Sequence, residues 1–267
     1  MTKTILITGA TDGIGLETAK LLVSAGHHVL LHGRNSDKLE QLITTLSTLS
    51  RTSKLESYVA DLSDLANVEA LARAVIDKHD TLDVLVNNAG VFKTPYPITE
   101  AGFDVRFVVN TIAPYLLTQC LLPLLGQGSR VVNVSSAAQA SVDLQALRGE
   151  RRLPDSAAYA QSKLALMMWS HRLARVHQNP MIVSVNPGSM LGSKMVKEGF
   201  GVAGGDLQIG ANILKRAALE DAFADASGKY FDNDSGRFAP PHPDGLNVQK
   251  CQRLVETLEV VLAKHTQ

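Results

Sequence analysis

The chain has 267 residues, and its 26 Lys and Arg residues balance 26 Asp and Glu residues, so the formal net charge is zero. This balance excludes a general electrostatic nucleic-acid binder, which needs a basic excess. The composition of 45% hydrophobic and 19% charged residues is typical of a globular protein with a sizeable core. Its two cysteines, Cys120 and Cys251, cannot form a disulfide framework and indicate reduced thiols in a cytoplasmic protein.

Short apolar runs alternate along the chain with longer segments of helical periodicity. The apolar runs predict buried strands at residues 5–7, 29–31, 55–60, 82–86, 131–134, 181–185 and 229–231. The periodic segments predict helices at about 14–25, 37–49, 65–76, 103–125, 159–176, 207–219 and 248–264. Two stretches, 137–158 and 187–206, show neither pattern and are expected to be irregular.

Alternating strands and helices, with strands that are apolar throughout, predict an α/β fold. We expect a single doubly wound domain over residues 1–267, with a parallel sheet of about seven strands and helices on both faces. The first residues contain too short an apolar run for a signal peptide. The longest apolar run, residues 116–125, is far below the ~20 residues that a membrane span needs. We therefore expect no membrane span and a cytoplasmic location.

The first predicted strand ends in a glycine-rich segment, Thr-Gly-Ala-Thr-Asp-Gly-Ile-Gly, at residues 8–15. Glycine lets a phosphate approach the backbone, and the positive end of the following helix attracts it. The spacing differs from the general G-x-G-x-x-G fingerprint, so a purely structural tight turn is the alternative. The position between a strand and a helix favours dinucleotide binding. The expected contacts are Gly9, Thr11, Asp12, Gly13, Ile14 and Gly15.

Further motifs follow in a fixed order along the chain. They are Asn-Asn-Ala-Gly at 87–90, Asn110 in Val-Asn-Thr, Ser-Ser at 135–136, Tyr159 with Lys163, and Pro-Gly at 187–188. With the glycine-rich turn, they give the chain a resemblance to the short-chain dehydrogenase/reductase family over nearly its whole length. Segments 33–35 and 227–231 resemble the retinol dehydrogenase-like branch. The resemblance implies a Rossmann fold and an oxidoreductase that moves a hydride between NAD(P) and a carbonyl or alcohol.

Tyr159 and Lys163 are four residues apart in a predicted helix, so their side chains share one face. Carbonyl reduction needs a proton donor at the oxygen that becomes negatively charged. Bringing the pKa of a tyrosine from ~10 to ~7 takes about 4 kcal/mol. One ammonium at ~4 Å supplies about that much at an effective dielectric of ~20. We therefore expect Lys163 to lower the pKa of Tyr159, the general acid or base; an amphipathic helix with a solvated lysine is the alternative.

The resemblance implies the remaining catalytic roles. Ser136 would hydrogen-bond the substrate oxygen, with Ser135 as the alternative for this role. Asn110 would position a water molecule that links Lys163 to solvent, or it would bond neighbouring backbone instead. The resemblance also implies that Tyr159 and Lys163 contact the cofactor.

Other family positions are expected to line the cofactor. Asn87 would do so and would also brace the central strands. Asp61 would contact the adenine, or it would be a plain helix N-cap. The other cofactor contacts that the resemblance implies are Leu62, Ala89, Gly90, Pro187 and Gly188.

The end of the second strand indicates which nicotinamide cofactor is used. Gly33 stands where NAD-preferring folds carry an acid, and Arg34 and Asn35 follow it. Arg34 would meet a 2′-phosphate through its guanidinium, or it would be a solvated loop arginine. Asp12 argues the other way, because family members that take NADP often have a basic residue there. We predict NADP(H), with NAD(H) as the alternative, and no metal, since hydride transfer needs none and the eight histidines show no metal-ligand spacing.

Residues 187–206 correspond to the mobile substrate flap of the family. Met190 and Leu191, with Met195 and Phe200, would form an adaptable apolar surface for substrate, or they would pack on the core. Ser193 stands next to the position where the family often has a threonine that bonds the carboxamide.

These motifs together predict an NADPH-preferring carbonyl reductase that acts on an apolar small molecule. A non-catalytic dinucleotide-binding sensor or interaction protein on the same fold is the alternative. The loop at 137–158 would shape the pocket entrance or cover a surface that relatives use for assembly. A homodimer and a homotetramer therefore both stay open.

Overall fold

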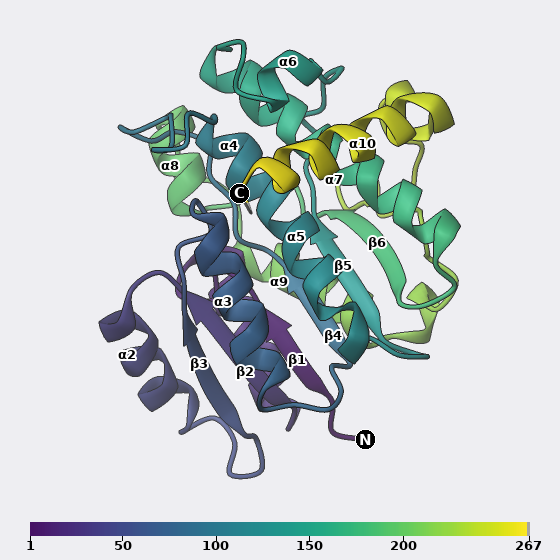
Figure 1. Cartoon of the computed structure of the whole chain (residues 1–267). Coiled ribbons are helices and arrows are strands. Elements are labelled where there is room, and N and C mark those ends of the chain that lie inside the picture. The colour runs from purple at the N-terminus through teal and green to yellow at the C-terminus, as the bar shows by residue number, and fades with distance from the viewer. Residues whose placement is uncertain (266–267) are drawn as a thin grey trace.

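The computed structural model describes residues 1–265. Its strands form one eight-stranded sheet in the order β3-β2-β1-β4-β5-β6-β7-β8, parallel except for the β7–β8 pair (Figure 1). The strands are β1 Thr4–Ile7, β2 His28–Gly33, β3 Leu55–Val59, β4 Val84–Asn87, β5 Arg130–Val134, β6 Met181–Asn186, β7 Tyr230–Asp232 and β8 Arg237–Phe238. The predicted Rossmann-like sheet is confirmed, and β8 adds an antiparallel strand at its edge.

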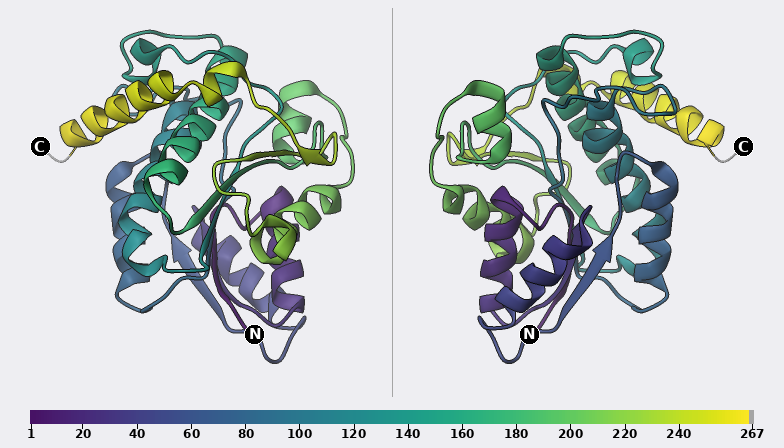
Figure 2. Two further views of the ribbon diagram at one scale, coloured as in Figure 1. Left: turned by 90° about the vertical axis from the view of Figure 1, so that its right-hand side faces the viewer. Right: turned by 90° about the vertical axis from the view of Figure 1, so that its left-hand side faces the viewer.

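Helices cover both faces of the sheet, as predicted (Figure 2). Helices α3, α5 and α7 pack on one face with α10 against α7, and α1, α2 and α9 pack on the other. The helices are α1 Gly13–Ser24, α2 Ser36–Leu46, α3 Leu65–Ile76, α4 Val105–Phe107, α5 Ala113–Leu121, α6 Leu144–Leu147, α7 Asp155–Val176, α8 Lys194–Phe200, α9 Leu207–Leu219 and α10 Val248–His265.

The strands read as continuous apolar runs because successive side chains enter different cores. Leu6 and Leu30 point into the core under α3, α5 and α7. Ile5, Ile7 and Leu31 point into the core under α1, α2 and α9. Because alternate side chains of each run are buried on opposite faces of the sheet, the apolar runs mark the positions of these strands in the sequence.

Both stretches expected to be irregular contain a short helix. Helix α6 lies within 137–158, and Asp143 caps it by accepting hydrogen bonds from two backbone N–H groups. Helix α8 lies within 187–206, and Ser193 caps it. Helices of four and seven residues are too brief to show a helical period, so the pattern did not predict either helix.

The helix predicted at 103–125 is interrupted. A π-helix, Val108–Ile112, separates α4 from α5, and Pro114 lies in the first turn of α5. Proline has no N–H for the carbonyl four residues before it, which here belongs to Asn110. Helix α7 also starts earlier than predicted, at Asp155 directly after Pro154.

The stretch Val105–Leu124 is long and apolar enough to cross a membrane, with a mean hydropathy of 1.4. This stretch is longer than the apolar run at 116–125, because its mean hydropathy stays high across polar residues such as Arg106 and Asn110. Within the protein, 72% of this window is buried. Helix α5 packs against α3 and α7, which is typical of the core helix of a globular fold.

Candidate active site

The predicted motifs meet at the carboxyl ends of the central strands. The glycine-rich turn follows β1, residues 87–90 end and follow β4, residues 135–136 follow β5, and Pro187 follows β6. The strand order reverses between β1 and β4, and ligands of doubly wound sheets bind in the crevice at such a point. The fold therefore gathers these motifs at the point of the sheet where such folds bind their ligands.

The glycine-rich turn packs directly on the Asn-Asn-Ala-Gly motif. A Cβ on Gly15 would lie 2.2 Å from Gly9 O and 2.4 Å from Asn88 Nδ2. Thr8 Oγ1 accepts hydrogen bonds at 3.0 Å from the N–H groups of Asn88 and Ala89. Gly9 and Gly15 are thus needed by the turn itself, which holds the two motifs in a fixed relation.

His32 braces the same turn and was not predicted as a site residue. It is buried at the end of β2, its Nδ1 accepts a hydrogen bond from Gly9 N at 3.2 Å, and its Nε2 lies 3.0 Å from Ala60 O. Burial lowers its pKa to about 4, so the ring is neutral at pH 7. A histidine at the end of an apolar strand was the only signal in the sequence.

The turn and the nearby backbone fit a dinucleotide. The first N–H groups of a helix have no partner within it, and those of α1 face the crevice end of β1. Asp12 Oδ1 accepts from Gly13 N at 2.7 Å, so this carboxylate caps α1. A Cβ on Gly90 would lie 3.3 Å from Asn110 Oδ1 and 3.5 Å from Lys163 Nζ. Glycine at this position therefore lets the backbone approach the Asn110 amide and the Lys163 ammonium closely.

Tyr159 and Lys163 project from one face of α7, as predicted. Lys163 Nζ lies 5.9 Å from the centre of the Tyr159 ring. Burial raises the pKa of Tyr159, although a hydrogen bond with Ser136 acts to lower it. The expected lowering by Lys163 is therefore wrong for this structure. The reason is that Phe92 packs on the phenol ring at 5.0 Å, and Phe200 of α8 stacks on Phe92 at 5.5 Å.

Lys163 is itself buried, with 4% of the residue exposed. Its Nζ donates a hydrogen bond to Val134 O at 2.7 Å. Burial lowers its pKa to about 8. The solvated-lysine alternative is therefore wrong, and the ammonium is held in the crevice where β5 ends.

Asn110 lies in the π-helix and bonds backbone, which is the alternative role considered for it. Its Oδ1 accepts from Val91 N at 2.8 Å, and its Nδ2 donates to Val91 O at 2.9 Å. The same Nδ2 donates to Ser162 Oγ at 3.0 Å, and Ser162 Oγ donates to Tyr159 O at 2.7 Å. Ser162, which was not predicted, thus links Asn110 to the helix turn that carries Tyr159.

Two other motif residues brace the sheet. Asn87 Nδ2 donates to Asn133 Oδ1 at 2.8 Å and to Thr118 Oγ1 at 3.2 Å, so this side chain joins the central strands to α5. Ser135 is buried, and its Oγ donates to Lys163 O at 3.3 Å. Ser136, in contrast, is only partly buried and bonds Tyr159. The geometry thus favours Ser136 over Ser135 for a role at the reacting oxygen.

The segment after β3 does not place Asp61 at the N-cap of the following helix. Asp61 is exposed, and its Oδ1 accepts from Ser63 N at 2.9 Å. The N-cap of α3 is Asp64, so the N-cap alternative for Asp61 is wrong. The Leu62 side chain packs in the hydrophobic core, which leaves only its backbone for a ligand.

The end of β2 carries no acid and has no room for one. A Cβ on Gly33 would lie 2.7 Å from Thr11 Cγ2. Arg34 is exposed beside it. Asn35 Oδ1 accepts from Lys38 N at 2.8 Å and so caps α2. The Asn35 side chain is thus engaged in the cap, whereas the Arg34 side chain next to it is exposed.

In the flap, the two predicted substrate residues separate. Met190 is exposed and has a φ of 53°. Leu191 is buried, and it lies against Gly188 and Gly210. Leu191 thus packs on the core, which is the alternative considered for it, because α9 approaches it closely, and its contact with substrate stays a prediction. Ser193 Oγ caps α8 by accepting a hydrogen bond from Val196 N at 3.3 Å, which leaves its O–H proton available for a carboxamide.

The chain is similar to known proteins over most of its length. The family model for short chain dehydrogenases matches residues 3–200. Retinol dehydrogenase 13 of Homo sapiens is 30% identical over 273 residues, which cover 94% of this chain and 82% of that protein.

Two solved structures are similar over most of their length. An uncharacterized protein from Mycobacterium paratuberculosis has a TM-score of 0.79 at 28% identity, covering 97% of this chain and 92% of that one. A short chain dehydrogenase from Shigella flexneri, complexed with NADP, has a TM-score of 0.69 at 28% identity, covering 87% of this chain and 97% of that one.

Proposed function

Because the chain belongs to the short-chain dehydrogenase family, in its retinol dehydrogenase-like branch, we propose that it is an NADP(H)-dependent oxidoreductase that interconverts a carbonyl and an alcohol on an apolar small molecule. The observation that carries this proposal is the placement of the Tyr159 ring, with the Lys163 ammonium 5.9 Å from its centre and Ser136 close enough to lower the pKa of its phenol. These three groups converge where a reacting oxygen needs two hydrogen-bond donors and a nearby positive charge.

The cofactor, when bound, supplies or accepts the hydride. Tyr159 Oη donates its proton to the oxygen that becomes negatively charged, and Ser136 Oγ donates a hydrogen bond to the same oxygen. Burial raises the pKa of Tyr159, so the phenol stays protonated at neutral pH. A protonated donor is what carbonyl reduction requires, and this favours reduction near pH 7.

Several contacts support a preference for NADP(H) and an apolar substrate. Arg34 is exposed beside the acid-free end of β2, where its guanidinium can bind a 2′-phosphate. Phe92 packs on the Tyr159 ring, Phe200 stacks on Phe92, and Met190 is exposed in the flap. These apolar side chains favour an apolar substrate. The name of the relative retinol dehydrogenase 13 also supports an apolar substrate.

The test is NADPH oxidation with a panel of apolar aldehydes and ketones. We expect turnover by the wild-type chain and at least a ~100-fold loss in Tyr159→Phe, the range of general acid–base catalysis. Tyr96→Phe is the matched control, since Tyr96 is 80% exposed and should keep wild-type activity. Full turnover by Tyr159→Phe would remove this phenol from the mechanism, and tight NADPH binding without turnover on any substrate would favour the sensor.

Cofactor choice has its own test. Arg34→Ala should weaken NADPH binding about tenfold or more and leave NADH binding unchanged, because it removes a charge-assisted hydrogen bond to phosphate. Arg51→Ala, an exposed arginine in the loop before β3, is the control. Equal affinity for NADH and NADPH in both proteins would contradict the preference.

A further inference from the structure

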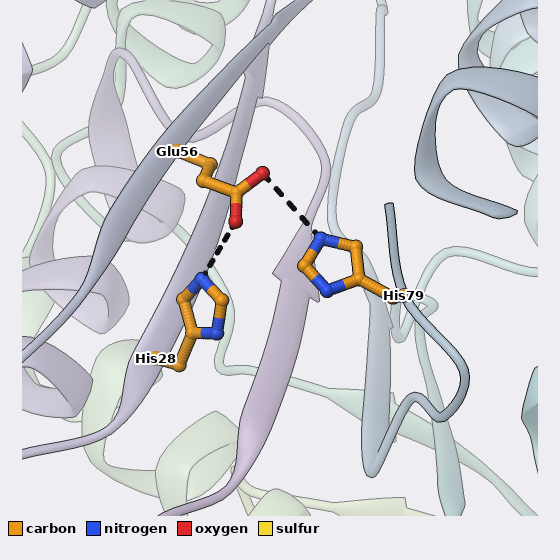
Figure 3. A group of neighbouring side chains, drawn as sticks. All are labelled: His28, Glu56 and His79. Carbon is orange, nitrogen blue, oxygen red and sulfur yellow. Dashed lines mark hydrogen bonds and ion pairs between the residues drawn. The ribbon is translucent and has the colours of Figure 1, made fainter. Parts of the chain in front are cut away.

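Three side chains of metal-binding type meet at the edge of the sheet opposite the candidate active site (Figure 3). His28 begins β2, Glu56 lies in β3, and His79 follows α3. The register pairs Glu56 with Leu30, two residues after His28. His28 and Glu56 therefore stand on the same face of the sheet, the one that α3 covers.

The donor atoms of this cluster already point at one another. His28 Nε2 lies 2.9 Å from Glu56 Oε1, and His79 Nε2 lies 3.4 Å from Glu56 Oε2. All three ligand atoms are within 4.8 Å of one another. Zinc ligands at ~2.0–2.1 Å in a tetrahedron are about 3.3 Å apart, so shifts of about 1 Å would close the set around an ion.

We propose that His28, Glu56 and His79 bind a Zn²⁺ ion. Two imidazoles and one carboxylate are a common zinc donor set, and three protein ligands leave the fourth position to water. Tyr58 Oη donates a hydrogen bond to Glu56 Oε2 at 2.8 Å. This contact orients the carboxylate from outside the ligand set, as such outer partners do in metal sites.

Burial and charge are compatible with the ion. The side chains of His79, His28 and Glu56 are 10%, 15% and 27% exposed, so the cluster is shielded but reachable from solvent. Lys78 Nζ lies 3.9 Å from Glu56 Oε2, and this ammonium opposes a cation. Its side chain is 60% exposed, so it can turn into water when the ion enters.

The bound ion joins β2, β3 and the segment after α3, which the sequence keeps far apart. Ligand binding to the folded state alone raises its stability. The site lies at the amino ends of the strands, so it takes no part in the proposed hydride chemistry. Zinc binding and NADPH-dependent turnover are therefore independent properties of the chain.

The test is titration of the full-length chain, stripped of metal with EDTA and dialysed, with ZnCl₂ in a calorimeter at pH 7.5. We expect one saturable site per chain, and a melting temperature raised by about 5 °C at a free zinc concentration 100 times the Kd. His79→Gln should weaken zinc binding at least ~100-fold, since loss of outer partners alone costs 10–100-fold. Glu56→Gln should do the same while still accepting the Tyr58 hydrogen bond.

His265→Gln is the matched control, because it removes one exposed imidazole from α10 and leaves the cluster intact. This variant should bind zinc as the wild type does. Circular dichroism checks that each variant is folded. If His79→Gln does not fold, the zinc affinity of Glu56→Gln is compared with that of the wild type instead. The proposal is overturned if the wild-type chain takes up no zinc saturably, or if the folded cluster variants bind it as tightly as the wild type.

Discussion

Lys163 is a buried ammonium that should cost the folded protein stability at neutral pH. Burial lowers its pKa from 10.5 to about 8. This difference in pKa corresponds to about 3 kcal/mol of unfolding free energy. The folded state is less stable by that amount below pH 8, where Lys163 is protonated in both the folded and the unfolded protein. Between pH 8 and 10.5 the unfolded chain binds more protons than the folded one, so stability rises with pH in this window.

The substitution Lys163→Met removes the charge and keeps a long side chain. It also leaves Val134 O without the hydrogen bond that Nζ donates at 2.7 Å, which costs about 1–3 kcal/mol. That loss does not depend on pH, whereas the charge effect does. We therefore expect the wild type to gain about 2–3 kcal/mol of unfolding free energy relative to Lys163→Met between pH 7 and pH 10.

Urea unfolding followed by far-UV circular dichroism at pH 7, 8, 9 and 10 measures this difference. Lys38→Met is the control, since Lys38 is exposed on α2 and its removal should give a difference that does not change with pH. A difference between wild type and Lys163→Met that stays within about 0.5 kcal/mol over this range would refute the reasoning. Lys163→Met should also lose NADPH-dependent turnover, because function requires the ammonium that destabilises the fold.

Three further predictions concern packing and pairing within the chain. Arg106 is 2% exposed and pairs with Asp104 and with Asp155, so Arg106→Leu should lower the free energy of unfolding in urea by about 3–5 kcal/mol. Asp155→Asn changes a half-exposed partner and should lower it by under ~1 kcal/mol. Equal losses of stability in the two variants would contradict this expectation. Gly15→Ala places a Cβ 2.2 Å from the backbone oxygen of Gly9, so NADPH affinity measured by fluorescence titration should fall about tenfold or more. An unchanged Kd for NADPH would show that the turn rearranges to accept the Cβ. Phe92→Ala uncovers the active-site phenol, so the midpoint of the pH–rate profile should move to lower pH, and a midpoint that stays in place or rises would assign the raised pKa to another cause.

The alternation of apolar runs and helical segments predicted the sheet and its two helical layers. This worked because the runs Ile5–Ile7 of β1 and Val29–Leu31 of β2 are apolar and buried on both faces of the sheet. The spacing of Tyr159 and Lys163 predicted a shared helix face for the same local reason. The short helices α6 and α8 and the interruption near Asn110 were missed, because each depends on one cap or one proline. The single-domain assignment, the roles of the site residues and the cytoplasmic location stay predictions.

What the sequence by itself determined is local: which segments are strands or helices, and which motifs end up at the carboxyl edge of the sheet. Only the tertiary structure decided the pKa of Tyr159, because the Phe92 ring that packs on its phenol comes from the segment after β4, far from α7 in the sequence. It alone brought together His28, Glu56 and His79, whose spacing along the chain carries no metal signal. Burial and pairing between distant segments depend on how elements pack, and no periodicity within one element encodes that.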